Sequence, residues 1–242
     1  MGMNIEVNIT DSPEKLAKRV AKAIRRMLQD SGQSRFDIAL SGGSTPAILF
    51  DRLAGKFSDL PEWQRVHLWW GDERCVEPGS EESNYRMAYD RLISRVTIPL
   101  ENIHRIKGED DPESEVLRYE SEIRTCLNHR GDWPVFDLVL LGMGDDGHTA
   151  SIFPDRPDLA KSDRICAVAL HPRTGQKRIT LTGQVINNAN QIFIMVTGSG
   201  KADRISEIMN NLEQAADLPV SHIVPLHGKL TWYLDAEAAG KI

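Results

Sequence analysis

Cysteine is scarce in this sequence of 242 residues: it occurs three times, at Cys75, Cys126 and Cys166, and never with CxxC spacing. An odd, scattered set of cysteines argues against a disulfide framework or a zinc ribbon and favours a reducing compartment, so we expect a cytoplasmic protein. The seven histidines form no H-E-x-x-H pattern, and His222 and His227 lack the helical spacing of a ligand pair. We therefore predict no metal site.

A basic excess is also absent. The chain has 29 Lys and Arg against 35 Asp and Glu, a net charge of −6, and its longest basic block is the Arg25-Arg26 pair. Proteins that bind nucleic acids or anionic membranes show a basic excess or stripe, so we expect neither partner. The longest aliphatic runs, such as residues 192–196, are far shorter than the roughly 20 residues of a membrane-spanning helix. The first eleven residues lack a basic segment followed by an apolar one, so we expect no secretory signal.

No internal repeat, low-complexity tract or flexible linker interrupts the chain, and we predict a single domain over residues 1–242. Apolar or alternating runs typical of strands occupy residues 5–9, 35–40, 66–70, 136–141, 165–170, 178–182, 192–197 and 229–234. Helical patterns alternate with them at residues 13–28, 46–53, 84–96, 112–127 and 201–212. This alternation predicts an α/β protein with a mostly parallel sheet and helices on both faces. In such sheets, ligands bind beyond the carboxyl ends of the strands.

Residues 41–46, with the sequence SGGSTP, follow one predicted strand and open a helix. Two glycines allow the backbone to approach a ligand closely, and the free amides and hydroxyl groups at the helix start form a cradle for an anion. No Gly-Lys-Ser/Thr follows at the required spacing, so this is not a Walker A loop. The alternative is an ordinary strand-to-helix turn with serine and threonine caps.

Residues 142–147 (GMGDDG) match the G-x-G-x-x-G pattern after a strand, yet we reject a dinucleotide site here. Asp145 and Asp146 would repel a pyrophosphate, Pro154 comes too soon for a full crossover helix, and the next strand ends without an acidic residue for a ribose. His148 follows this loop directly. A neutral imidazole is suited to general-base catalysis, and a neighbouring carboxylate can orient it. The alternative is a surface histidine or a helix cap.

Three further polar positions lie near strand boundaries. Residues 72–74 (DER) follow a strand, and the planar fork of Arg74 suits a carboxylate, carbonyl or phosphate. Arg178 lies near the start of a strand, and Lys201 follows a T-G-S-G turn that forms a second candidate anion site. The alternative for each cation is a solvated surface charge or an ion pair of small energetic weight.

These motifs, taken in order, closely resemble the 6-phosphogluconolactonase family. The resemblance runs from about residue 10 to 239 and rests on residues 41–46, 71–74, 83–85, 141–154, 178–182, 200–202 and 232–235. It implies a Rossmann-like α/β fold shared with glucosamine-6-phosphate deaminase. It also implies hydrolysis of a small phosphorylated sugar lactone, 6-phospho-D-glucono-1,5-lactone, to 6-phospho-D-gluconate in the oxidative pentose phosphate pathway, without a cofactor.

The resemblance assigns the general base to His148, and we expect Asp146 to orient its imidazole and Arg74 to stabilise the developing oxyanion. The turn at residues 43–45, Arg178 and Lys201 correspond to phosphate contacts. Asp72 is expected to hold substrate hydroxyls or Arg74. The predicted substrate-binding set is therefore Ser41, Gly43, Ser44, Thr45, Asp72, Arg178 and Lys201.

Two other functions remain open at this point. A glucosamine-6-phosphate deaminase resembles this sequence but has a catalytic Glu before the proline of the His-containing motif, where this chain has Phe153. A sugar-phosphate sensing domain would use the same loops, although the chain has no room for an appended DNA-binding helix-turn-helix and is acidic. The sequence leaves the oligomeric state open between monomer and dimer.

Overall fold

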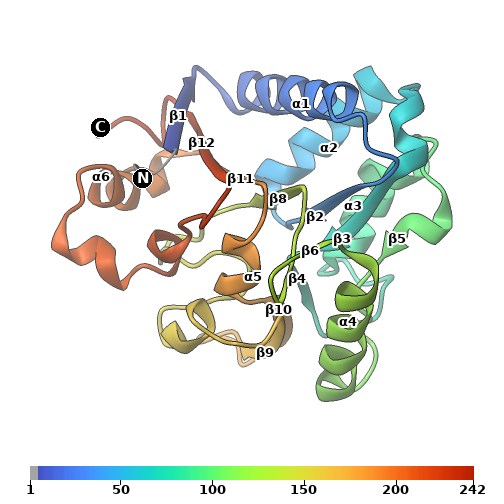
Figure 1. The fold of residues 1–242 in the computed structure, drawn as a ribbon. Coiled ribbons are helices and arrows are strands. Elements are labelled where there is room, and N and C mark those ends of the chain that lie inside the picture. The colour runs from blue at the N-terminus through green and yellow to red at the C-terminus, as the bar shows by residue number, and fades with distance from the viewer. Residues whose placement is uncertain (1–4) are drawn as a thin grey trace.

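The computed structural model describes residues 5–242. The first four residues, which belong to the predicted single domain and to the stretch where no secretory signal is expected, lie outside the described residues. A seven-stranded sheet forms the centre of the protein, with the order β1-β12-β11-β8-β2-β3-β5. Every neighbouring pair in this sheet is parallel. The predicted α/β class and mostly parallel sheet are confirmed (Figure 1).

The order of the strands reverses in the middle of this sheet. From β2 (Phe36–Leu40) the chain moves outward through β3 (Val66–Trp70) to β5 (Ile103–His104). It then returns to the other side of β2 and moves the opposite way, through β8 (Leu138–Leu141) and β11 (Gln191–Val196) to β12 (Lys229–Asp235), with β1 (Ile5–Thr10) at the edge. Neighbouring loops diverge to opposite faces at such a reversal, which leaves a crevice beyond the carboxyl ends of β2 and β8.

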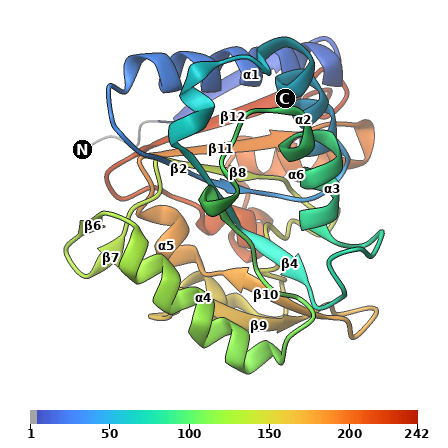
Figure 2. The same ribbon diagram turned by 90° about the vertical axis from the view of Figure 1, so that its right-hand side faces the viewer.

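Helices cover both faces of the large sheet. Figure 2 shows α1 (Pro13–Asp30) above the sheet and α4 (Pro112–Cys126) below it. The remaining helices are α2 (Ser44–Phe57), α3 (Asn84–Arg91), α5 (Gly183–Asn187) and α6 (Ala202–Met209). The start of α1 follows from its sequence, because the Ser12 side chain accepts a hydrogen bond from the Lys15 amide and Pro13 occupies the first turn.

A second, smaller sheet lies on the face that carries α4. It consists of β4 (Asp72–Arg74), β10 (Lys177–Leu181) and β9 (Cys166–Leu170), and both of its pairings are antiparallel. The strands predicted at residues 165–170 and 178–182 are β9 and β10, and the sequence analysis did not assign them to a separate antiparallel sheet. The six residues between them form a hairpin connection, whereas parallel neighbours need a crossover of a dozen or more residues. A two-stranded pairing of β6 (His129–Arg130) with β7 (Trp133–Pro134) completes the strands.

Two predicted helices are shorter than expected. The helix predicted over residues 84–96 ends at Arg91, because Leu92 leaves the helical conformation at φ −130° and a 3₁₀ turn follows. The helix predicted over residues 201–212 is preceded by a 3₁₀ turn and ends at Met209. Asn211 has φ +52°, a left-handed conformation that asparagine tolerates and that terminates a helix.

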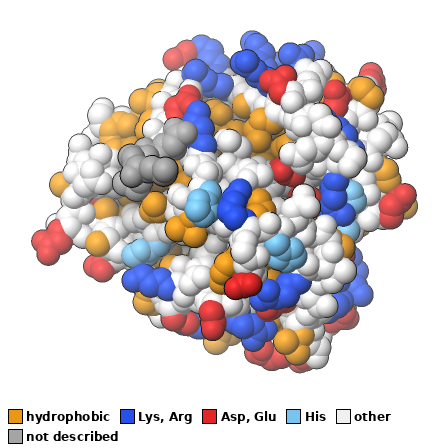
Figure 3. Space-filling view, in the orientation of Figure 1, with side chains coloured by type: hydrophobic (Ala, Val, Ile, Leu, Met, Phe, Trp, Pro, Cys, Tyr) orange, Lys and Arg blue, Asp and Glu red, His pale blue; other side chains and the backbone are white. Residues whose placement is uncertain are grey.

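Large apolar side chains fill the core, and side chains of both charges lie on the surface. Trp63, Trp69 and Trp70 are among the largest fully buried side chains, and the strands β2 and β8 are buried along their whole length. On the face shown in Figure 3, acidic and basic side chains are interspersed with hydrophobic and neutral ones. None of the helices within residues 5–242 has the length and apolar composition that crossing a membrane requires.

Candidate active site

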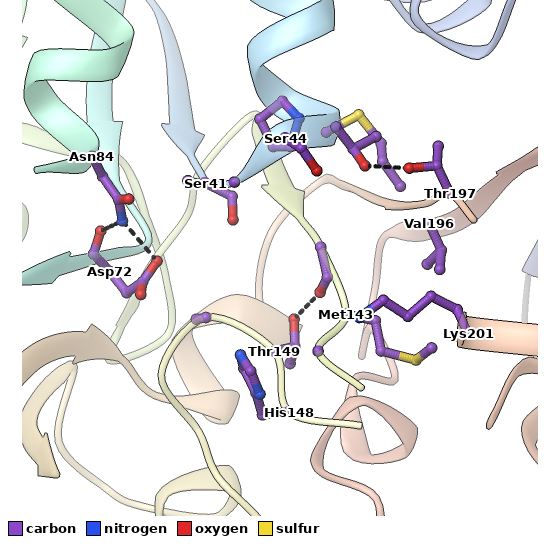
Figure 4. A pocket seen from close by; sticks show the side chains of 18 of the residues that line it. Ser41, Ser44, Asp72, Asn84, Met143, His148, Thr149, Val196, Thr197 and Lys201 are labelled. Carbon is purple, nitrogen blue, oxygen red and sulfur yellow. Dashed lines mark hydrogen bonds between the residues drawn. The ribbon is translucent and has the colours of Figure 1, made fainter. Parts of the chain in front are cut away.

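A cavity of about 250 Å³ lies at the carboxyl edge of the large sheet, where the strand order reverses. The loops after β2 and β8 form two of its walls, and the small sheet and the end of β11 form the others. Nine of the residues predicted to make the site line this cavity: Ser41, Gly43, Ser44, Thr45, Asp72, Arg74, His148, Arg178 and Lys201. Figure 4 shows Asp72 and Asn84 at one end of the cavity, Lys201 and Thr197 at the other, and His148 between them.

The loop after β2 presents the start of α2 to the cavity. Gly43 is the N-cap of this helix, has φ +104° and provides no side chain to cap it. Amides in the first turn of a helix have no intrahelical acceptor, so they are free to bind an anion, and the helix dipole favours negative charge at this position. Thr45 also forms a hydroxyl–hydroxyl hydrogen bond of 2.7 Å with Thr197 at the end of β11, which joins two walls of the cavity.

The loop after β8 holds His148 against Asp146. The ring nitrogen Nδ1 lies 2.5 Å from Asp146 Oδ1, and the His148 amide donates to the same oxygen at 3.1 Å. The hydrogen bond with His148 lowers the pKa of Asp146 well below its ordinary value. Asp146 does not line the cavity; it contacts the imidazole at Nδ1. The ring nitrogen Nε2 makes no hydrogen bond within residues 5–242, so it is the nitrogen available for chemistry.

Gly144 makes the position of this imidazole possible. A Cβ atom at residue 144 would lie 2.1 Å from both Cε1 and Nδ1 of His148, a distance that real contacts do not show. The backbone holds the same arrangement, because the Gly144 amide donates to the His148 carbonyl at 2.9 Å. After Gly147, no helix begins before the 3₁₀ turn at Pro157. The crossover helix of a dinucleotide-binding loop is therefore missing from this region, as the position of Pro154 predicted.

Asp72 contacts residues that the sequence analysis did not name. It is 4% exposed, its Oδ2 accepts a 2.7 Å hydrogen bond from Ser151, and its carbonyl accepts one of 2.9 Å from Asn84. Asp72 does not pair with Arg74; the Arg74 guanidinium donates instead to the Glu82 carbonyl at 2.6 Å. Ser151 and Asn84 therefore hold Asp72, whereas Arg74 contacts the loop that precedes α3.

Glu73 fixes the loop that follows β4. Its side chain is buried and accepts hydrogen bonds from the amides of Arg74, Asn84 and Tyr85 and from the Ser83 hydroxyl, all between 2.7 and 3.0 Å. Burial raises the pKa of Glu73 despite these bonds. The carboxylate thus anchors the start of α3 and places Asn84 in the cavity wall.

Arg74 and Arg178 lie directly opposite each other on the antiparallel pair β4–β10. Like charges at opposed positions destabilise a sheet. Burial, and after it the charge of Arg74, lowers the pKa of the Arg178 guanidinium. The Nε atoms of both arginines are buried without a hydrogen-bond partner among the described residues, and Arg178 comes no closer than 4.0 Å to Asp72. Two adjacent cations with unused donors are suited to an anionic ligand.

Lys201 lies at the opposite end of the cavity from Asp72 (Figure 4). Its ammonium group forms an ion pair with Asp145, which the sequence analysis did not anticipate. The turn before Lys201 was expected to be a second anion site. There, the Gly198 amide already donates to both carboxylate oxygens of Asp235 at 3.1 Å, so that amide is engaged within the protein.

Several lining residues were missed because their sequence signals are weak. Asn84, Thr149 and Thr197 line the cavity. A Cβ atom at Gly42 would lie 1.9 Å from Asn84 Oδ1, so the first glycine of the SGGSTP turn accommodates Asn84. The side chains of residues 5–242 contain no group of three or more His, Cys, Asp and Glu that could hold a metal ion.

Comparisons with known proteins identify the family of this chain. A model of the family described as "Glucosamine-6-phosphate isomerases/6-phosphogluconolactonase" matches residues 11–232. The chain belongs to this family. Within the glucosamine-6-phosphate isomerase/6-phosphogluconolactonase family, a 6-phosphogluconolactonase of Haemophilus influenzae is 41% identical over 202 residues, which cover 83% of this chain and 85% of the relative.

Solved structures of the same family have the same fold. The structure of 6-phosphogluconolactonase from Trypanosoma brucei superimposes with a TM-score of 0.88 at 27% identity and covers 100% of both chains. A monomeric glucosamine-6-phosphate deaminase superimposes with a TM-score of 0.82 at 22% identity, covering 98% of this chain and 100% of the deaminase. The second similarity concerns the fold alone, and it confirms the expected deaminase-like architecture.

Proposed function

We infer that this chain hydrolyses 6-phospho-D-glucono-1,5-lactone to 6-phospho-D-gluconate, the lactonase step of the oxidative pentose phosphate pathway. Relatives of about the same length carry the name 6-phosphogluconolactonase at about 40% identity. The observation that carries the inference is the cavity itself, which places one free imidazole nitrogen between groups suited to an anion and groups suited to sugar hydroxyls.

The phosphate of the substrate is assigned to the turn at residues 43–45, with Lys201 and Arg178 neutralising its charge. The free amides of the first turn of α2 support this assignment, as do the unused donors of Arg178. Asp72 and Asn84, at the other end of the cavity in Figure 4, are suited to hydrogen bonds with sugar hydroxyls.

His148 is assigned as the general base. Nε2 takes a proton from a water molecule as that water attacks the lactone carbonyl carbon, and Asp146 orients the ring and stabilises the imidazolium. Arg74, or a backbone amide, stabilises the oxyanion of the tetrahedral intermediate. The imidazolium then returns its proton to the ring oxygen as the bond between that oxygen and the carbonyl carbon breaks, which opens the lactone.

Phe153 argues against deamination. The related deaminase motif places a catalytic Glu at this position, whereas Phe153 is fully buried and packs 4.9 Å from the His148 ring. An apolar ring cannot shuttle protons, which amino-sugar isomerisation needs at several positions. Lactone hydrolysis needs one base and one acid, and a single histidine can act as each in turn.

The test is a rapid coupled measurement of 6-phosphogluconate formation, corrected for spontaneous lactone opening, with unphosphorylated gluconolactone and glucosamine 6-phosphate as comparison substrates. We expect hydrolysis of both lactones, with a strong preference for the phosphorylated one, and no release of ammonia. Arg178→Ala should raise KM and reduce that preference by about tenfold, since a charge-assisted hydrogen bond contributes roughly 1.5–3 kcal/mol. An unchanged preference would place the phosphate elsewhere.

A further inference from the structure

The lysine assigned to the substrate phosphate already has an anionic partner within the chain. Lys201 lies at the end of a 3₁₀ turn, Ser199–Lys201, and its side chain is 20% exposed and lines the cavity. Asp145 belongs to the loop after β8 and forms an ion pair with the Lys201 ammonium. The Asp145 side chain is 76% exposed and does not line the cavity, so it approaches the lysine from the solvent side.

The two anions compete for one cation. A phosphate dianion on the cavity side of Lys201 and the Asp145 carboxylate on its solvent side share one ammonium group, so each weakens the interaction of that ammonium with the other. Asp145 is free to move, because its exposed side chain has no other side-chain hydrogen bond among the described residues. Arg173, on the β9–β10 hairpin, and Asp146 are the other charged groups near it.

We propose that Asp145 is a specificity-determining residue that competes with the substrate phosphate for Lys201 and so weakens the binding of phosphorylated ligands. The proposal rests on the function inferred above. It has a direct consequence for product release, because 6-phosphogluconate keeps the phosphate group of the substrate. Asp145 should therefore also weaken binding of the product, and thereby limit product inhibition.

The main experiment compares wild-type protein with Asp145→Asn, which is close in shape and lacks the charge. We expect the variant to have a KM for 6-phosphogluconolactone about two- to fivefold lower, the range expected for an ion pair that is partly exposed. The inhibition constant of 6-phosphogluconate should fall by about as much, and kcat/KM for unphosphorylated gluconolactone should not change. Asp145→Glu, which keeps the charge within reach of Lys201, should behave like the wild type.

Two controls separate this role from a general effect of charge. Asp163→Asn makes the same charge change at an exposed residue outside the ion pairs among residues 5–242, and it should alter neither constant. In the Lys201→Ala background, Asp145→Asn should lose its effect on KM and on product inhibition, because the two residues then no longer interact.

The outcomes distinguish the two hypotheses. A wild-type protein without lactonase activity would overturn the proposed function and this inference with it. An active Asp145→Asn variant with unchanged KM and unchanged product inhibition would overturn the inference alone. An effect of Asp145→Asn that persists in the Lys201→Ala background would also overturn it, since Asp145 would then act by another route.

Discussion

The two glycine-rich loops of the cavity follow neighbouring strands, β2 and β8, and they use their backbone amides in opposite ways. In the loop after β2, Gly43 begins a helix without a side-chain cap, and the first-turn amides point away from any intrahelical acceptor. In the loop after β8, the amides of Gly144, Gly147 and His148 all donate within the loop itself. The amides of the first loop are therefore free to bind a ligand. The amides of the second loop are bonded within that loop and hold the His148 side chain in position.

This difference explains why similar glycine content predicts different functions. A turn with free amides is suited to a ligand whose charge is fixed, such as a phosphate. A turn whose hydrogen bonds are satisfied is rigid, which is what a catalytic side chain requires, because small displacements of a reacting group reduce the rate strongly. Gly144 also helps to fix the position of His148, because the absence of a side chain at residue 144 leaves room for the imidazole.

The largest effect should come from removing the side chain that the second loop holds. His148→Asn is expected to lower kcat at least about a hundredfold, the range for a lost general base, and to leave the binding of 6-phosphogluconate nearly unchanged. Steady-state kinetics and calorimetry measure the two quantities. The hydrogen bond with His148 lowers the pKa of Asp146, so in the wild type this carboxylate stays ionised above about pH 4 and cannot cause a loss of kcat near neutral pH. Wild-type turnover in this variant would contradict the assignment of the base.

Gly144→Ala tests the rigidity of the same loop without removing a polar group. Its Cβ would overlap the imidazole at 2.1 Å, so the ring must move, and we expect kcat to fall about tenfold or more while KM changes little. Gly79→Ala is the matched control, because a Cβ at Gly79 has nothing within 4 Å. Equal kcat values for the two variants would show that the ring position tolerates displacement.

The parts of the site that are formed by short, continuous motifs could be predicted from the sequence. The SGGSTP turn predicted a helix start with free amides, and the GMGDDGH segment predicted a histidine beside a carboxylate; the structure shows both arrangements. Each depends on residues that are close in sequence and follow a buried strand, so backbone geometry alone brings them together.

Contacts between distant segments could not be predicted in this way. Asp145 and Lys201 are 56 residues apart, and the sequence analysis treated Asp145 only as a group that repels pyrophosphate. The position of Asn84 against Gly42 depends on Glu73, which anchors α3. The antiparallel sheet of β4, β10 and β9 was missed for a related reason: apolar runs mark buried strands, but they do not state which sheet a strand joins.

The smallest effect should come from the first loop, where the proposed function requires free amides and no fixed side chain. Gly43→Ala places a Cβ at a residue with φ +104°, where non-glycine residues are strained by about 1–3 kcal/mol, although a Cβ there meets no atom within 4 Å. The turn should relax away from this strain and reorient its amides. We expect KM for the phosphorylated lactone to rise about three- to tenfold while kcat and the KM for unphosphorylated gluconolactone stay close to wild type. Gly55→Ala, later in α2 and without positive φ, is the control. If Gly43→Ala lowered kcat for both lactones equally, the two loops would not divide binding and catalysis between them, and the contrast between their amides would have no functional meaning.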